Sequence, residues 1–195
     1  ITCRDWSSDV CSSDLEVRRH LPVMLAAAAI MNESRRARFL CLAPNGEMAT
    51  MMKGIISREV GYSLDVRVRV GYSTTHMSRC QLALVTSGTA TLECAVAGTP
   101  MVVYYRVGPF TYLPAKFLIK VPHLAMVNLL LNRPAVPELI HIRARPAEMA
   151  RLALELLSDP PRMEKQRQDL ETAVGMLGGP GASHRAAKEI LELSY

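Results

Sequence analysis

Hydrophobic positions follow two patterns along the chain, one typical of strands and one typical of helices, and the patterns alternate from one segment to the next. Apolar runs, and one stretch of alternating polar and apolar residues, predict strands over residues 38–42, 65–70, 82–86 and 101–105. Helical spacing predicts helices over residues 16–32, 48–59, 90–97, 110–120, 146–157, 161–176 and 182–193, with a helical turn at 74–79. This order predicts an α/β fold, a Rossmann-like and mostly parallel sheet flanked by helices.

Two strands differ in their expected burial. The segment 82–86 is apolar throughout, which is typical of a strand buried on both faces, whereas the alternating segment 65–70 predicts a half-buried strand near a sheet edge. The chain from residue 129 to 145 follows neither the strand pattern nor the helix pattern, and its prolines favour a loop. We expect only helices from about residue 146 onward.

The first fourteen residues also lack a helical or strand periodicity of hydrophobic residues. They have no signal-peptide pattern and resemble translated sequencing-adapter sequence, so we expect a non-native tail at 1–14 and a domain at 15–195. The chain does not start with Met, which leads us to expect truncation. Because the tail holds three acids and one base, the formal net charge of +5 rises to +7 without it.

Composition excludes several classes of protein. Hydrophobic residues make up 49% and charged residues 21%, which argues against disorder. Aromatic residues make up only 5%, too few for a nucleic-acid stacking platform, and no nucleic acid is expected as a partner. The longest apolar run, residues 21–31, is shorter than the roughly 20 residues that cross a bilayer. Cys41, Cys80 and Cys94 form no CxxC pair, which favours a reducing cytosol and no metal site.

The stretch VTSGTATLE (85–93) carries the most chemical information. A buried strand ends there and a helix begins, which in a parallel sheet is where ligands bind. Gly88 allows close approach to the backbone, and Ser87 and Thr89 offer hydroxyl groups beside the helix N–H groups, an arrangement suited to a diphosphate. Glu93 lies one turn further on, where it could accept hydrogen bonds from a ribose diol. The alternative is that Ser87 or Thr89 only caps the helix, and the local sequence leaves both interpretations open.

With its neighbours, this stretch resembles the lipid-A-disaccharide synthase family. The likeness rests on TSGTATLECAVAGTPMVVYYR, PFTYLPAKFLIK and VNLL, and extends from about residue 16 to the C-terminus. It implies the C-terminal half of a GT-B glycosyltransferase, without the family's GSR motif and without the N-terminal acceptor domain that holds the catalytic acid/base residue. No catalytic residue is therefore expected in this chain, which should be inactive alone.

The resemblance implies a UDP pocket. Ser87, Gly88, Thr89 and Glu93 would line it, and Asn128 matches a functional Asn of the family, with turn stabilisation as its alternative role. Arg106 would meet an anion or form a surface salt bridge, and Asn45 would contact uracil or, more readily, serve a turn. The implied substrates are UDP-2,3-diacylglucosamine and 2,3-diacylglucosamine 1-phosphate, with inversion at the anomeric carbon and neither cofactor nor metal.

Residues 110–120 mix apolar and basic side chains, which suits a lipid headgroup boundary as well as an ordinary packing helix. The membrane candidates are Phe110, Tyr112, Lys116, Phe117 and Lys120. The family resemblance implies a cytoplasmic protein, peripheral on the inner face of the cytoplasmic membrane, with a homodimer as a possible assembly. A loose basic region that includes Arg162 and Lys165 is read first as a solvated helix face, and Glu138 forms no recognisable carboxylate pair.

Two other functions stay open. One is a UDP-N-acetylglucosamine 2-epimerase-like enzyme. Such enzymes resemble one another in having two adjacent acidic residues at this turn, whereas here Leu92 precedes Glu93. The other is a catalytically inactive UDP-binding or dimerisation module. A Rossmann dehydrogenase is disfavoured, because no GxGxxG follows a strand.

Overall fold

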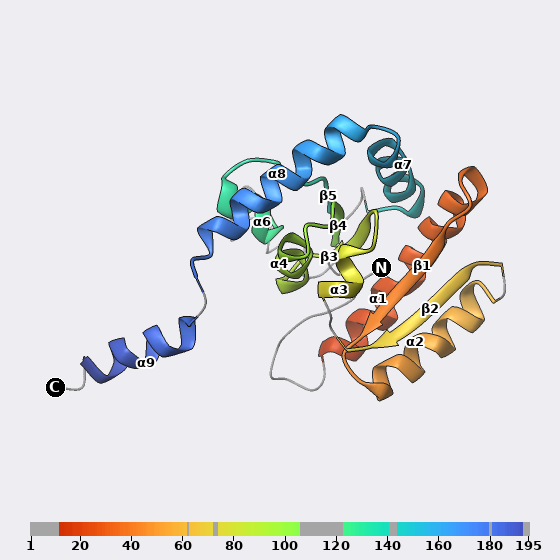
Figure 1. The fold of residues 1–195 in the computed structure, drawn as a ribbon. Helices are drawn as coiled ribbons and strands as arrows, with labels where there is room; N and C mark the ends of the chain where they lie inside the picture. Colours follow the sequence, from red (N-terminus) through yellow and green to blue (C-terminus); the bar gives the residue numbers. More distant parts are fainter. Residues whose placement is uncertain are drawn as a thin grey trace, which may run out of the picture.

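The computed structural model of the 195-residue chain describes residues 12–61, 63–71, 74–105, 123–140, 144–179 and 181–192 (Figure 1). The strands are β1 (Arg38–Ala43), β2 (Asp65–Val70), β3 (Ala83–Thr86), β4 (Met101–Tyr105) and β5 (Glu138–Ile140). The helices are α1 (Ser12–Ser34), α2 (Gly46–Glu59), α3 (Thr74–Ser78), α4 (Thr89–Val96), α6 (Met126–Leu131), α7 (Pro146–Leu157), α8 (Pro160–Met176) and α9 (Ala182–Glu192).

All strand pairs in the described residues are parallel, as predicted. β1 pairs with β2, and β3, β4 and β5 pair in that order. Every residue of β3 is buried, whereas β2 has no buried residue and, in the part of the chain that the structure describes, pairs with β1 alone, so both burial predictions are confirmed. The α/β architecture with parallel strands between helices is likewise confirmed.

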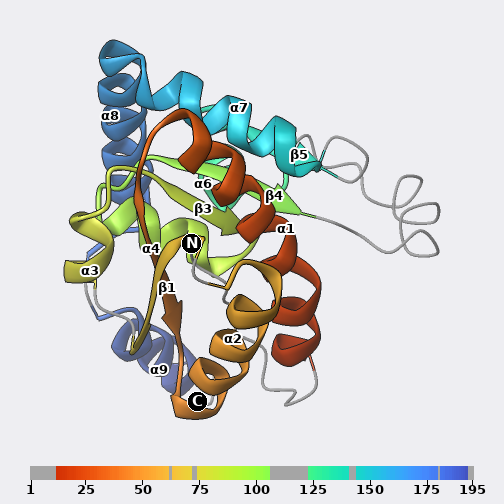
Figure 2. The same ribbon diagram turned by 90° about the vertical axis from the view of Figure 1, so that its right-hand side faces the viewer.

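Two hydrophobic cores lie on opposite sides of the strands. Successive residues of a strand point to opposite faces, so Leu84 belongs to one core and Val85 to the other. The first core also contains Leu21 of α1, Met52 of α2 and Met149 of α7. The second contains residues of α4, α6 and α8, and α8 packs against both α4 and α6. Figure 2 shows α1 and α7 side by side, in agreement with their contacts.

The structure differs from the prediction at two places. α1 begins at Ser12, inside the stretch expected as a tail. Asp14 in its first turn stabilises the helix through a favourable interaction with the helix dipole. The expected loop after residue 129 instead contains the end of α6 and the strand β5. β5 is only three residues long and exists because it pairs with β4, a tertiary contact that local pattern does not report. The helix predicted over 110–120 lies outside the described residues.

The last helix stands apart from the rest. Figure 1 shows α9 projecting from the body beyond α8, and its Ile190 and Leu191 are about two-thirds exposed, at 64% and 63%. Among the described residues, no helix has the length and apolar character needed to span a bilayer.

Candidate functional site: the β3–α4 turn and its supports

The turn between β3 and α4 is built around Gly88. This residue is the N-cap of α4 and has φ 137° and ψ −162°, a conformation that is essentially restricted to glycine. Among the described residues, no side chain caps the first turn of α4. The sequence alternative in which Ser87 or Thr89 caps the helix is therefore not the arrangement found here. The Thr91 N–H donates to the Gly88 carbonyl at 3.1 Å, whereas no hydrogen bond among the described residues uses the N–H groups of Thr89 and Ala90, at the carboxyl edge of the strands.

Ser87 ties this turn to two neighbours. Its backbone N–H donates to the Tyr104 carbonyl at 3.2 Å, and its Oγ donates to the Leu124 carbonyl at 2.7 Å. The hydroxyl proton is thus used within the protein, so Ser87 can meet a ligand only as an acceptor while this bond persists. Thr89, in contrast, is exposed at the start of α4, and Glu93 lies half-buried one turn further along the same face.

A hydrogen-bond network holds the segment that Ser87 contacts. Glu138 accepts hydrogen bonds from the backbone N–H groups of Leu124 at 3.0 Å and Ala125 at 3.1 Å. It also accepts from Nδ2 of Asn128 at 2.6 Å, and its Oε1 lies 3.9 Å from Nδ1 of His123. The carboxylate therefore fixes the start of α6 beside the β3–α4 turn. Sequence reasoning missed this role for Glu138, because its partners are 10 to 14 residues away and no local motif joins them.

Asn128 is fully buried within this network. Besides donating to Glu138, its Nδ2 donates to the Val136 carbonyl at 2.8 Å, and its Oδ1 accepts from the Val136 N–H at 2.8 Å. All of these bonds hold the chain that leads from α6 into β5. The geometry fits the stabilising role that the sequence left open, and direct contact of Asn128 with a ligand stays a prediction.

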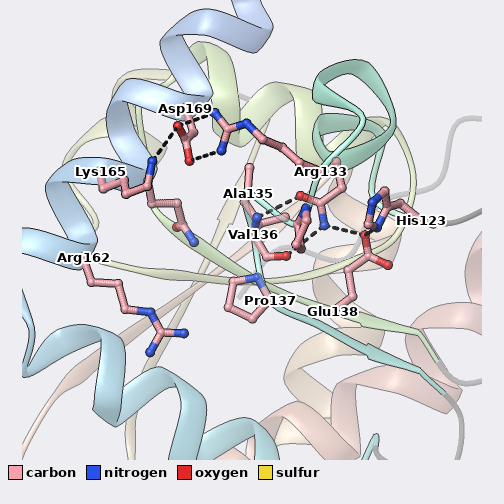
Figure 3. Close-up of a pocket in the computed structure, with 12 residues that line it drawn as sticks. His123, Arg133, Ala135, Val136, Pro137, Glu138, Arg162, Lys165 and Asp169 are labelled. Atoms are coloured by element: carbon pink, nitrogen blue, oxygen red, sulfur yellow. Dashed lines mark hydrogen bonds and ion pairs between the residues drawn. The ribbon is translucent and has the colours of Figure 1, made fainter.

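A cavity of about 440 Å³ lies beside this network (Figure 3). Arg133 donates from Nη1 and Nη2 to the two carboxylate oxygens of Asp169, at 2.9 and 2.6 Å, and Lys165 Nζ lies 3.6 Å from the same carboxylate. The Arg133 guanidinium holds the pKa of the Asp169 carboxyl below its usual range. Arg162 also lines the cavity, so basic side chains from α8 gather at this surface.

The other predicted site residues lie elsewhere. Asn45 is the N-cap of α2, where its Oδ1 accepts from the Met48 N–H at 2.8 Å. Arg106, Phe110, Tyr112, Lys116, Phe117 and Lys120 lie outside the described residues.

The described residues contain no group of three His, Cys, Asp or Glu side chains that could hold a metal ion. Cys41, Cys80 and Cys94 form no disulfide bond among the described residues, and burial raises the pKa of the Cys41 thiol, so this side chain stays neutral.

Comparison with known proteins agrees with the resemblance. The family model for lipid-A-disaccharide synthetase matches residues 10–192. Lipid-A-disaccharide synthase of Syntrophus aciditrophicus is 38% identical over 179 residues, which cover 91% of this chain and 46% of that protein. The enzyme of the same name from Solibacter usitatus is 35% identical, with coverages of 91% and 46%. The enzyme of the same name from Gluconobacter oxydans is 47% identical over 115 residues, which cover 58% of this chain and 28% of that protein.

The chain thus spans about half the length of the first two relatives, while the match reaches along nearly all of the chain itself. With the parallel strands and the glycine turn described above, this match shows that the chain belongs to the lipid-A-disaccharide synthase family, whose members are glycosyltransferases.

Proposed function

We propose that this chain is the UDP-sugar-binding half of a lipid-A-disaccharide synthase of the GT-B type. The single observation that carries the proposal is the β3–Gly88–α4 turn, where the N–H groups of Thr89 and Ala90, without a side-chain cap, meet the carboxyl edge of the parallel strands. The diphosphate binds to these N–H groups and to the exposed Thr89 hydroxyl. Glu93, on the same helix face, accepts hydrogen bonds from the ribose.

The reaction proposed for the intact enzyme joins two lipid-linked sugars. The 6-hydroxyl of 2,3-diacylglucosamine 1-phosphate attacks the anomeric carbon of UDP-2,3-diacylglucosamine, the bond to the diphosphate breaks, and the configuration inverts. A base in the other half of the enzyme takes the hydroxyl proton. The part played by this chain is to hold UDP and to stabilise the negative charge that develops on the leaving diphosphate. The chain alone therefore binds UDP without catalysing transfer.

The site of action proposed for the enzyme is the inner face of the cytoplasmic membrane. The support is the mixture of aromatic and basic residues over 110–120, together with a family name that refers to lipid A. A homodimer is the proposed assembly, and sedimentation of the purified chain tests it.

Titration of UDP into the purified chain tests the nucleotide site. We expect micromolar binding, which Glu93→Gln weakens about tenfold because a hydrogen bond to a charged group is lost. Glu171→Gln is the matched control, since Glu171 is an exposed acid on α8. Absence of UDP binding together with clean self-association would instead support the dimerisation module.

A further inference from the structure

A second cavity, of about 520 Å³, opens at the edge of the strands that faces away from the β3–α4 turn. It is lined by the amino ends of β1 and the segment before β3, and by the carboxyl ends of α1 and α7. The β3–α4 turn follows the other end of β3, about 13 Å away for a strand of this length. The volume is within the range of small-molecule sites. This cavity is therefore separate from the proposed nucleotide site.

Four arginines surround the cavity. Arg35, Arg36, Arg38 and Arg79 are all exposed, and no acidic side chain is among the described residues that line it. None of the four takes part in an ion pair found within the described chain. The carboxyl ends of α1 and α7 carry only about half a negative charge each, which four guanidinium groups outweigh. The rim is thus suited to an anionic group that guanidinium forks can hold.

Apolar side chains line part of the same cavity. Phe39 and Leu84 line it while exposing little surface, and Leu154 and Leu157 of α7 line it half-buried. A free phosphate would use the arginines but leave this apolar lining wet. A ligand that is complementary to both parts carries an alkyl chain as well as an anionic head.

We propose that this cavity binds an anionic lipid, with its phosphate among the four arginines and an acyl chain against the apolar interior. The inference goes beyond the donor site, because it concerns a different edge of the strands and different residues. It also predicts a face through which the domain meets an acidic membrane surface. The complementarity of charge at the rim and of apolar surface within carries the assignment.

The test uses the full chain and dodecyl phosphate, a single-chain probe kept below its micelle concentration, measured by calorimetry. Inorganic phosphate and dodecyl maltoside test the head and the chain separately. The variant is the double substitution Arg36→Gln/Arg79→Gln, which changes exposed side chains only. The matched control is Arg18→Gln/Arg58→Gln, two exposed arginines that do not line the cavity.

We expect saturable binding of dodecyl phosphate that the Arg36/Arg79 variant weakens at least about tenfold and the control leaves unchanged. Leu157→Trp, which fills the apolar wall, should weaken it too, and thermal unfolding of each variant separates this loss from misfolding. Flotation with vesicles should follow the same order for phosphatidylglycerol in phosphatidylcholine, with no flotation on phosphatidylcholine alone.

The proposal is overturned by equal affinity for inorganic phosphate, by equal affinity for dodecyl maltoside, or by equal losses in the variant and the control. Absence of any binding to the purified chain overturns it as well. The arginine-lined face would then be a contact surface for another part of a longer protein. UDP added at saturation should not displace the probe. Failure of UDP to bind would refute the nucleotide site and leave this result unaffected.

Discussion

Asn128 in α6 and Glu138 at the start of β5 are joined by a hydrogen bond of 2.6 Å from Nδ2 to Oε1. The bond links a helix and a strand across a segment, from residue 129 onward, that the sequence predicts as a loop. Through the Leu124 and Ala125 N–H groups, the same carboxylate fixes the backbone whose carbonyl receives the Ser87 hydroxyl proton. The support of the β3–α4 turn therefore depends on an amide and a carboxylate that form no hydrogen bond with that turn among the described residues.

Removal of the Asn128 amide should destabilise the protein strongly. Asn128→Ala deletes three hydrogen bonds at a fully buried position and leaves the Val136 N–H without its acceptor, so we expect a loss of about 2–4 kcal/mol in the free energy of unfolding. Urea unfolding measures it. Gln168→Ala, an exposed amide on α8, is the control and should change the free energy of unfolding by less than about 0.5 kcal/mol. A loss as small as that of the control would contradict the network described here.

The Arg133–Asp169 ion pair should make stability depend on pH. The pKa of Asp169 is lowered in the folded state, so the pair stabilises the protein above the unfolded pKa of about 3.9, and this contribution disappears as the pH falls through the lowered folded value. Asp169→Asn should cost about 1–3 kcal/mol at neutral pH and progressively less below about pH 4. Urea unfolding at a series of pH values measures the difference.

Asp65→Asn serves as the control for that experiment, because Asp65 pairs with Arg67 on the exposed strand β2 at 3.4 Å. An exposed pair of this kind contributes little, so the cost should stay below about 1 kcal/mol at every pH. A pH-independent difference between the wild type and Asp169→Asn would show that the ion pair is not the cause.

Gln166 should anchor α8 to the sheet. Its side chain is buried, and its Oε1 accepts the Met101 N–H at 2.7 Å, at the first residue of β4. Gln166→Leu leaves that buried N–H without an acceptor and should cost about 1–3 kcal/mol, whereas Gln166→Glu keeps an acceptor oxygen at the same place. Hydrogen exchange of the Met101 amide should accelerate in the Leu variant. Unchanged exchange there would show that another group satisfies the N–H.

Two glycines should respond to alanine in opposite directions. Gly88 has a φ of 137° that alanine adopts only under strain, so Gly88→Ala should destabilise by about 1–3 kcal/mol and weaken UDP binding. Gly54 lies exposed within α2, and a Cβ added there meets no atom within 4 Å. Gly54→Ala should therefore stabilise the protein by about 0.5–1 kcal/mol. Thermal unfolding of both variants measures the contrast, and an equal response would mean that the backbone at Gly88 is not constrained.

The sequence by itself determined the elements whose pattern is local. The continuous apolar run of β3 predicts burial on both faces, and the alternation of β2 predicts burial on one face. Pro146 marks the start of α7. These signals arise from neighbouring residues. Gly88 at the end of a buried strand was recognisable for the same reason. Parallel strands between helices followed from the order of the elements.

Only the tertiary structure decided how those elements support one another. β5 is a strand because β4 lies beside it, and Glu138 matters because folding brings it to Leu124, Ala125 and Asn128. Arg35 and Arg79 line one cavity although they are 44 positions apart in the sequence. Such contacts depend on the folded path of the backbone, and residues distant in sequence carry no periodic signal of the partner they will meet.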